Sequence, residues 1–211
     1  YQRLIFQLEP EKAHALSLRA AEMLYKSWLN SILKKETPKL TTEKMGIVFD
    51  NPLGLAAGFD KNGDYLNFIT NIGFGYVEIG TVTPKAQFGN TQPRVFRVPE
   101  SKAIINHLGF NNKGVDYLKE KLRKINRNVP IGVNISKNAT TPIDKAYQDY
   151  EYCMRKIYSL SDYITLNVSS PNTKDLRNLQ LDKFFDNFIK NIKKLHTNLK
   201  KVYKRKVPIV I

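Results

Sequence analysis

Residues 163–173 read YITLNVSSPNT. The first half is apolar and rich in β-formers, which predicts a buried strand over Tyr163–Val168, and the polar remainder predicts a loop. Polar side chains gathered at the carboxyl end of a buried strand are typical of chemistry in an α/β barrel, because the loops at that end converge on one pocket. A Ser-Pro-Asn turn that only ends a strand is the alternative interpretation.

The same order of strand, polar or glycine-rich loop and helix recurs along the chain. Further strands are predicted over residues 53–57, 76–80, 131–135 and 207–211, and helices over residues 64–72, 144–159 and 181–201. Strands that alternate with helices predict a parallel sheet with helices on its outer face. Loops that carry Lys, Thr or Asn after the strands favour an incomplete (β/α)₈ TIM barrel over an open doubly wound sheet.

The length fits this incomplete barrel. The chain has 211 residues, whereas a barrel of this type needs about 250. Only about five of the eight strands of a barrel are predicted here, so we expect the chain to be the first part of a longer protein.

The composition excludes several classes of protein. Hydrophobic residues make up 42% and charged residues 25%, as in a globular domain. The single cysteine, Cys153, excludes an internal disulfide framework and a CxxC metal site, and we expect no metal. The net charge of +15 favours anionic partners. The lysines are scattered over several helices without interleaved aromatic residues, so we expect no nucleic acid and a solvated basic surface.

The segment Glu9–Leu33 predicts an amphipathic helix. On a helical wheel, four charged residues share one arc, and apolar residues take most of the rest. Those four are Lys12, Arg19, Glu22 and Lys26. So wide an apolar face predicts either a helix packed on the outside of the barrel or one that lies in a membrane interface. We divide the chain into an N-terminal helical extension, residues 1–40, and a barrel domain, residues 41–211.

Five motifs carry a resemblance to a known family. They are NPLGLAAGFDK at 51–61, EIGTVTP at 78–84, PRVFR at 93–97, NHLGFNN at 106–112 and NVSSPNT at 167–173. In these motifs the chain resembles the class 2 dihydroorotate dehydrogenases. The resemblance implies FMN as cofactor, oxidation of dihydroorotate to orotate in pyrimidine (UMP) biosynthesis, and a membrane quinone as electron acceptor. It also implies a peripheral membrane protein that contacts an anionic surface, on the cytoplasmic face of a bacterial inner membrane or on the mitochondrial inner membrane.

The resemblance assigns roles to individual residues. It implies Ser170 as catalytic base, where class 1 enzymes have a cysteine, and Thr173 as the relay for its proton. It implies that substrate is held by Lys61, Asn106, His107, Leu108, Gly109, Phe110, Asn167 and Asn172. It implies that FMN is held by Ala57, Gly58, Phe59, Asp60, Lys61, Thr81, Asn134 and Asn167. His14 and Arg97 match positions near the quinone entrance. His107 departs from the Arg that is common in the family, and we expect it to be a surface histidine.

Two other functions stay open from the sequence. Another FMN barrel, such as a tRNA-dihydrouridine reductase or a class 1 enzyme, would need a cysteine in a strand-end loop. A noncatalytic basic fragment that binds RNA would need clustered basic and aromatic residues. The chain shows neither feature. In the family, loops after the last strands of the barrel bind the FMN phosphate, and those strands are not among the five predicted here.

Overall fold

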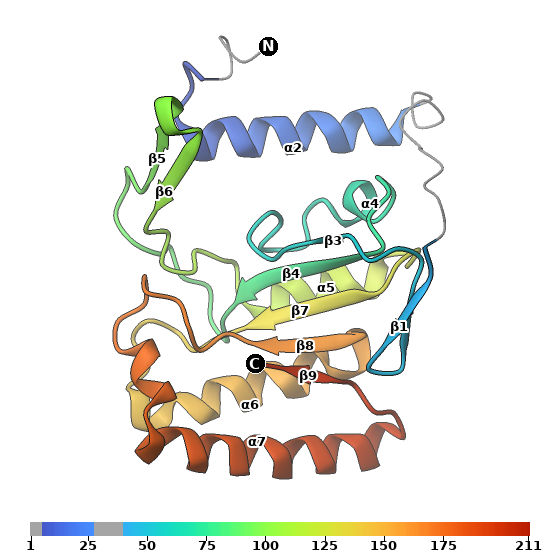
Figure 1. Ribbon diagram of the computed structural model, residues 1–211, viewed down its shortest axis with the longest axis vertical. Helices are drawn as coiled ribbons and strands as arrows, with labels where there is room; N and C mark the ends of the chain where they lie inside the picture. The colour runs from blue at the N-terminus through green and yellow to red at the C-terminus, as the bar shows by residue number, and fades with distance from the viewer. Residues whose placement is uncertain (1–5, 28–39) are drawn as a thin grey trace.

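The computed structural model describes residues 6–27 and 40–211. Its centre is a five-stranded parallel sheet in the order β3-β4-β7-β8-β9 (Figure 1). The strands are β3 (Gly54–Leu55), β4 (Tyr76–Val82), β7 (Ile131–Ile135), β8 (Tyr163–Leu166) and β9 (Ile209–Val210). Each strand pairs beside the sheet strand that precedes it in the chain, as in a barrel, whereas a doubly wound sheet reverses its strand order. The partial barrel that the sequence predicts is therefore confirmed.

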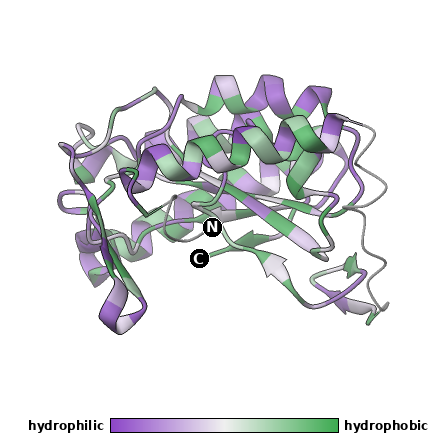
Figure 2. Ribbon diagram, turned by 90° about the horizontal axis from the view of Figure 1, so that it is seen from above, coloured by the Kyte–Doolittle hydropathy of each residue, from purple (hydrophilic) through white to green (hydrophobic). Residues whose placement is uncertain are grey.

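Three long helices pack on the outer face of this sheet. They are α5 (Val115–Lys124), α6 (Ala146–Ile157) and α7 (Asp182–Tyr203). Helix α5 packs on α6, and α6 packs on α7, so the helices follow one another around the sheet as the strands do. In Figure 2 the helices carry both green and purple residues, as expected for helices with one apolar and one solvated face. Cys153 in α6 is fully buried among these apolar side chains, so it packs as part of the core.

Several predicted boundaries were wrong. The predicted helix 64–72 is only the single turn α4 (Leu66–Ile69). Its expected first residues form a turn instead, because the Asp60 carboxylate accepts the backbone N–H groups of Asn62, Asp64 and Tyr65. The predicted helix 144–159 divides into η2 (Ile143–Lys145), α6 and η3 (Tyr158–Leu160), and η4 (Leu176–Gln180) precedes α7.

Two antiparallel hairpins were not predicted at all. The first pairs β1 (Thr42–Lys44) with β2 (Ile47–Phe49), and the second pairs β5 (Val95–Val98) with β6 (Ala103–Asn106). The short 3₁₀ helix η1 (Pro99–Ser101) connects β5 to β6. These hairpins lie outside the main sheet in Figure 1.

Helix α2 (Pro10–Lys26) forms the described part of the N-terminal extension. Residues 28–33 of the predicted helix lie outside the described residues. Helix α2 packs against α4 and β5 (Figure 1). Glu22, which we grouped with the charged face, is instead buried, and its carboxylate accepts the backbone N–H of Phe68 in α4 at 3.1 Å. Conversely, three apolar side chains of α2 are exposed to solvent: Leu16, Met23 and Leu24.

The inner face of the sheet is layered. Tyr163 and Gly132 are partners in the register of β7 and β8, and Tyr76 contributes a ring 6.3 Å from that of Tyr163. A Cβ on Gly132 would lie 2.0 Å from the Tyr163 ring, so the glycine makes room for the tyrosine. The next layer toward the carboxyl ends is polar, with Asn134 paired to Thr165. Aromatic packing therefore lies directly beneath the strand-end polar groups.

We expect Gly132→Ala to destabilise the protein by about 1–3 kcal/mol, because the added methyl group overpacks the buried Tyr163 ring. Urea denaturation of the complete gene product measures this change. The matched test is a double-mutant cycle with Tyr163→Leu, in which the alanine should cost less because the clashing ring atoms are gone. An equal cost in both backgrounds would contradict the layered packing.

Candidate functional site

A ladder of neutral polar side chains joins the carboxyl ends of β4, β7 and β8. The Thr81 hydroxyl donates to Asn134 Oδ1 at 2.6 Å, and Asn167 Nδ2 donates to Thr81 Oγ1 at 3.3 Å. Gly80 makes this approach possible, because a Cβ there would lie 2.4 Å from the Asn134 carbonyl oxygen and its φ is +121°. The structure therefore brings together the predicted cofactor residues Thr81, Asn134 and Asn167.

The loop after β3 lies beside this ladder. The Gly58 N–H donates to the Gly80 carbonyl at 2.7 Å, which ties the loop of Ala57 and Gly58 to the end of β4. Among the described residues other than its two chain neighbours, no atom lies within 4 Å of a Cβ built on Gly58, so the loop presents open space there. Lys61 Nζ donates to the Gly58 carbonyl at 3.1 Å. Burial lowers the pKa of the Lys61 ammonium, and the nearby Glu11 carboxylate opposes that shift.

Asp60 has a structural role in this loop. Its carboxylate accepts three backbone N–H groups, and burial raises its pKa against the effect of those hydrogen bonds. Since its oxygens are turned toward the chain's own backbone, the side chain is committed to shaping the loop. Any cofactor contact from Asp60 would have to come from its backbone.

The serine loop forms a second cluster. Ser170 Oγ is half-buried and accepts the backbone N–H of Asn172 at 3.3 Å, and Asn172 Nδ2 lies 3.4 Å from both the carbonyl and Oδ1 of Asn106. Asn90 joins the same two loops, because its Nδ2 donates to the carbonyls of His107 at 2.7 Å and Asn172 at 3.2 Å. Sequence reasoning missed Asn90, whose only signal is its position in the loop that precedes PRVFR.

Thr173 is buried in this loop, with 4% of its surface exposed. Its hydroxyl has no hydrogen-bond partner among the described residues, and it shares none with Ser170. Burying a hydroxyl without a hydrogen-bond partner costs free energy, so we expect a ligand, a water or a rearranged side chain to bond the Thr173 hydroxyl.

The segment after β6 holds the remaining predicted substrate residues. His107 is exposed and stacks on Phe96 at 5.8 Å between ring centroids, which agrees with a surface histidine. Gly109 is required by its positive φ of 69° and by the Asn90 side chain 2.8 Å from a built Cβ. The Phe110 carbonyl accepts Asn112 Nδ2 at 2.8 Å, and the Leu108 side chain faces a neighbouring cavity.

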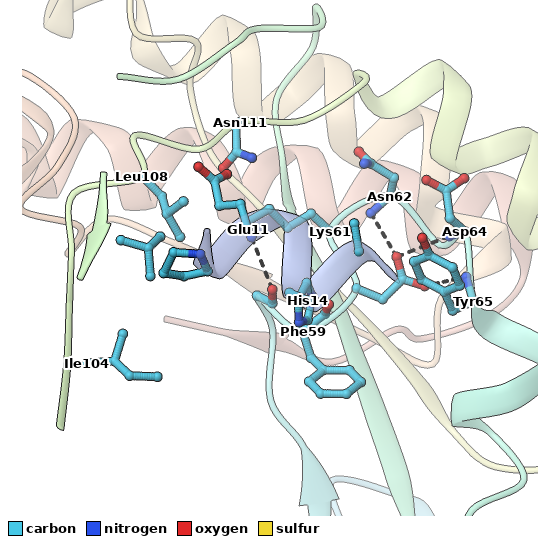
Figure 3. A pocket seen from close by; sticks show the side chains of 15 residues that line it. Glu11, His14, Phe59, Lys61, Asn62, Asp64, Tyr65, Ile104, Leu108 and Asn111 are labelled. Carbon is cyan, nitrogen blue, oxygen red and sulfur yellow. Dashed lines mark hydrogen bonds between the residues drawn. The ribbon is translucent and has the colours of Figure 1, made fainter. Parts of the chain in front are cut away.

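That cavity, of about 420 Å³, lies between α2 and the loop of Phe59 to Tyr65. Figure 3 shows Glu11, His14, Phe59, Lys61 and Leu108 around it. His14 Nε2 bonds the Phe59 carbonyl at 2.8 Å, and the His14 ring meets the Phe59 ring edge-on at 5.4 Å between centroids.

Arg97, in contrast, does not line this cavity. Its guanidinium donates to the carbonyls of Phe6 and Leu8 and lies 4.8 Å from the centroid of the Phe6 ring. Arg97 therefore holds the segment that leads into α2, whereas His14 faces the cavity itself.

A second cavity, of about 560 Å³, opens at the carboxyl ends of β7 and β8. Asn134, Thr165, Asn167 and Ser169 line it together with apolar groups that include Phe185. Neutral donors and acceptors beside apolar surface suit a flat heterocycle with several hydrogen-bonding edges.

The ion pair between Arg94 and Glu11 anchors α2 to the site. Arg94 is 6% exposed, and its Nε and Nη2 donate to the two oxygens of Glu11 at 2.9 and 2.8 Å. Its Nη1 donates to the carbonyls of Phe88 and Asn90, so the same side chain shapes the loop that joins the segments predicted to hold substrate. Arg94 lowers the pKa of the Glu11 carboxyl mainly through this hydrogen bond.

Comparison with known proteins gave consistent matches. A family model described as dihydroorotate dehydrogenase matches residues 39–211. A dihydroorotate dehydrogenase (quinone) of Coxiella burnetii is 46% identical over 207 residues, which is 98% of this chain and 60% of the relative. One of Cellvibrio japonicus is 48% identical over 99% of this chain and 61% of the relative. The chain thus spans about 60% of the length of these curated relatives.

Solved structures show the same likeness. The structure of DHODH from Eimeria tenella in complex with ferulenol has a TM-score of 0.78 and 36% identity, and covers 93% of this chain and 55% of that one. The ligand-free form of that enzyme has a TM-score of 0.77 and 38% identity, and covers 89% of this chain and 54% of that one.

We expect Glu11→Gln to lower the stability at pH 7 by about 2 kcal/mol, because it removes charge-assisted hydrogen bonds to a buried guanidinium. Glu11 has a folded-state pKa below its unfolded value, so its contribution is present above the unfolded pKa and is lost as the pH falls through the folded pKa. The difference from wild type should therefore shrink below about pH 4. Urea denaturation at both pH values checks this, with the exposed Glu100→Gln as control; a pH-independent difference would contradict it.

Proposed function

The chain belongs to the dihydroorotate dehydrogenase family, and we propose that it supplies the substrate and flavin contacts for oxidation of dihydroorotate to orotate, with FMN as cofactor and a membrane quinone as acceptor. The observation that carries the proposal is the meeting of the half-buried Ser170 loop with Asn106 beside the amide ladder of Thr81, Asn134 and Asn167. We keep residues 1–40 as a quinone-facing extension and 41–211 as the catalytic barrel.

The residues at the sheet edge fit FMN. The ladder offers amide donors and acceptors, Gly58 leaves open space, and Lys61 supplies one cation. When bound, FMN supplies the hydride acceptor. The Lys61 ammonium favours negative charge at the site, because an ammonium held in a partly buried position acts through a lower dielectric than water.

Ser170 is proposed to take the proton from C5 of dihydroorotate. A serine hydroxyl is a weak base, so its own proton must pass to a neighbour or a water as it accepts the new one. The Thr173 hydroxyl is buried without a partner among the described residues and does not bond Ser170, so we propose that a water connects the two hydroxyls in that transfer. Cys153 cannot replace the serine, since it is fully buried in α6 and burial raises the pKa of its thiol.

The asparagines are proposed to orient the pyrimidine ring. Asn106 and Asn172 already contact each other, and Asn167 belongs to the ladder, so paired amides can face a flat dione from two sides. Amides match its donors and acceptors without adding charge. The His107 side chain is exposed, and its carbonyl accepts Asn90 Nδ2. We propose that Leu108, Gly109 and Phe110, which follow it, complete this side of the substrate site.

The extension is proposed to serve quinone and membrane. The cavity beside His14 is largely apolar and lies under α2, and Arg97 fixes the segment before that helix. Leu16, Met23 and Leu24 present apolar surface outward. Within the described residues, no helix has the length and hydropathy to cross a bilayer. We propose peripheral attachment to an anionic membrane, on the cytoplasmic face of a bacterial inner membrane.

The test of the reaction is the flavin spectrum of the complete gene product. We expect dihydroorotate to bleach the flavin absorbance, and Ser170→Ala to slow this bleaching by roughly 10² to 10⁴-fold while FMN stays bound, because only the proton acceptor is lost. Stopped-flow absorbance measures the rate. The control is Ser101→Ala, an exposed serine of η1 that lines neither of the two cavities. If the purified protein contains no flavin, the proposed reaction is wrong. If dihydroorotate bleaches the flavin of Ser170→Ala as fast as that of wild type, only the assignment of Ser170 as the base is wrong.

We also expect the triple variant Leu16→Ser, Met23→Ser, Leu24→Ser to lose binding to anionic liposomes while dihydroorotate still reduces its flavin at the wild-type rate. The exposed apolar face of α2 would no longer enter the interface. Co-sedimentation measures binding. The control changes Leu181, which precedes α7, and Val202 within α7 to Ser, since these are also exposed, at 51% and 65%. Equal membrane binding by the triple variant and wild type would remove α2 as the contact.

A further inference from the structure

Glu78 lies on the inner face of β4, within the polar layer below the strand-end ladder. Its two oxygens are held by neutral donors: Asn134 Nδ2 donates to Oε1 at 2.8 Å, and the Thr165 hydroxyl donates to Oε2 at 3.0 Å. Among residues 6–27 and 40–211, no lysine or arginine forms an ion pair with it. A carboxylate held only by neutral donors keeps its negative charge uncompensated next to the site.

An ionised carboxylate accepts hydrogen bonds and cannot donate them, so Glu78 fixes the direction of every bond above it. Asn134 must turn its Nδ2 to Glu78, which leaves its Oδ1 to accept the Thr81 hydroxyl. Because that hydroxyl proton is used, Thr81 Oγ1 can only accept, and it accepts Asn167 Nδ2.

The last link reaches the serine loop. With its Nδ2 directed at Thr81, Asn167 presents Oδ1 to the backbone N–H of Ser169 at 3.3 Å. The orientation of both amides and of the Thr81 hydroxyl thus follows from one charge. Without such an anchor, an asparagine amide can flip and exchange its donor and acceptor ends.

Tyr163 is buried in the layer beneath Glu78, and its pKa is raised first by burial and then by the negative charge of Glu78.

We propose that Glu78 is a positioning residue that sets which ends of the Asn134 and Asn167 amides face the flavin. The inference rests on the proposed function, in which these amides hold FMN. It adds that the carboxylate acts on the flavin through the ladder, and that its charge opposes the negative charge of the reduced flavin.

The test compares Glu78→Gln with the exposed Glu120→Gln of α5 in the complete gene product. Glutamine keeps the shape, but it loses the charge and no longer dictates the direction of the ladder. We expect FMN to bind about tenfold more weakly to Glu78→Gln. The preference for reduced over oxidised flavin should rise about tenfold, which raises the midpoint potential by about 30 mV for two electrons. Glu120→Gln should change neither quantity.

Both quantities are measured without substrate, by fluorescence titration with FMN and by a spectral redox titration with dithionite. Unchanged FMN affinity overturns the proposal whatever the potential. Weaker FMN binding by Glu78→Gln with an unchanged potential would assign Glu78 to packing alone and would also overturn the proposal.

If Glu78→Gln fails to fold, Thr165→Val is tested instead, because it removes one donor to Glu78 and keeps the carboxylate charge. Since the charge is kept, weaker FMN binding without a rise in potential supports the proposal for this variant. FMN binding equal to wild type overturns it.

A failure of the proposed function can be distinguished from a failure of the positioning role of Glu78. It would appear as flavin that dihydroorotate cannot bleach, or as no bound flavin at all. In the second case the ladder is tested in the flavin-free protein, through the side-chain amide NMR signals of Asn134 and Asn167. Shifts of both signals in Glu78→Gln, with the surface amide of Asn71 unchanged, support the positioning role, and unshifted signals overturn it.

Discussion

Parallel pairing in chain order is the constraint on which the rest of this structure depends. Because β3, β4, β7, β8 and β9 add one after another, all their carboxyl ends reach one edge. The Gly58 N–H then meets the Gly80 carbonyl, and Thr81 meets Asn134 from a strand about fifty residues later. Outer positions such as Val77 and Ile79 are fully buried under the helices, which fixes the register. A slip of one residue would exchange these with Glu78 and destroy both the core and the ladder.

Two carboxylates of α2 attach the extension to this framework. Glu11 pairs with Arg94, and Glu22 accepts the Phe68 N–H, so α2 is held at two points along its length. Arg94 also holds the carbonyl of Asn90, whose side chain joins the loops of His107 and Asn172. The helix proposed to face the membrane and the loops proposed to face substrate therefore share one hydrogen-bond network. Breaking a buried pair leaves an uncompensated charge, which makes this attachment sensitive to single substitutions.

The sequence predicted some parts of this arrangement and not others, for physical reasons. Strand β7 was predicted to the residue because all five of its side chains are buried and its β-forming run is unbroken. Helix α4 was predicted too long because its first turn is decided by the Asp60 carboxylate and its docking by Glu22, 46 residues away in sequence. The motifs and the family resemblance named Thr81, Asn134 and Asn167 among the residues that hold FMN. They did not reveal Glu78 or Asn90 as their supports, since those contacts depend on strand register and loop packing.

The proposed flavin site combines one cation and one carboxylate with a layer of neutral groups. Lys61 reaches the site from the loop after β3, with its ammonium pKa lowered by burial, and Glu78 lies on the inner face of β4. The ladder residues are amides and hydroxyls, which can orient a heterocycle without adding charge. If FMN binds here as proposed, the cation favours arriving electrons and the carboxylate opposes them, so the balance between the two would set how readily electrons enter and leave the flavin. A flavin that passes its electrons onward would gain from both charges, because strong stabilisation of its reduced form would slow their release.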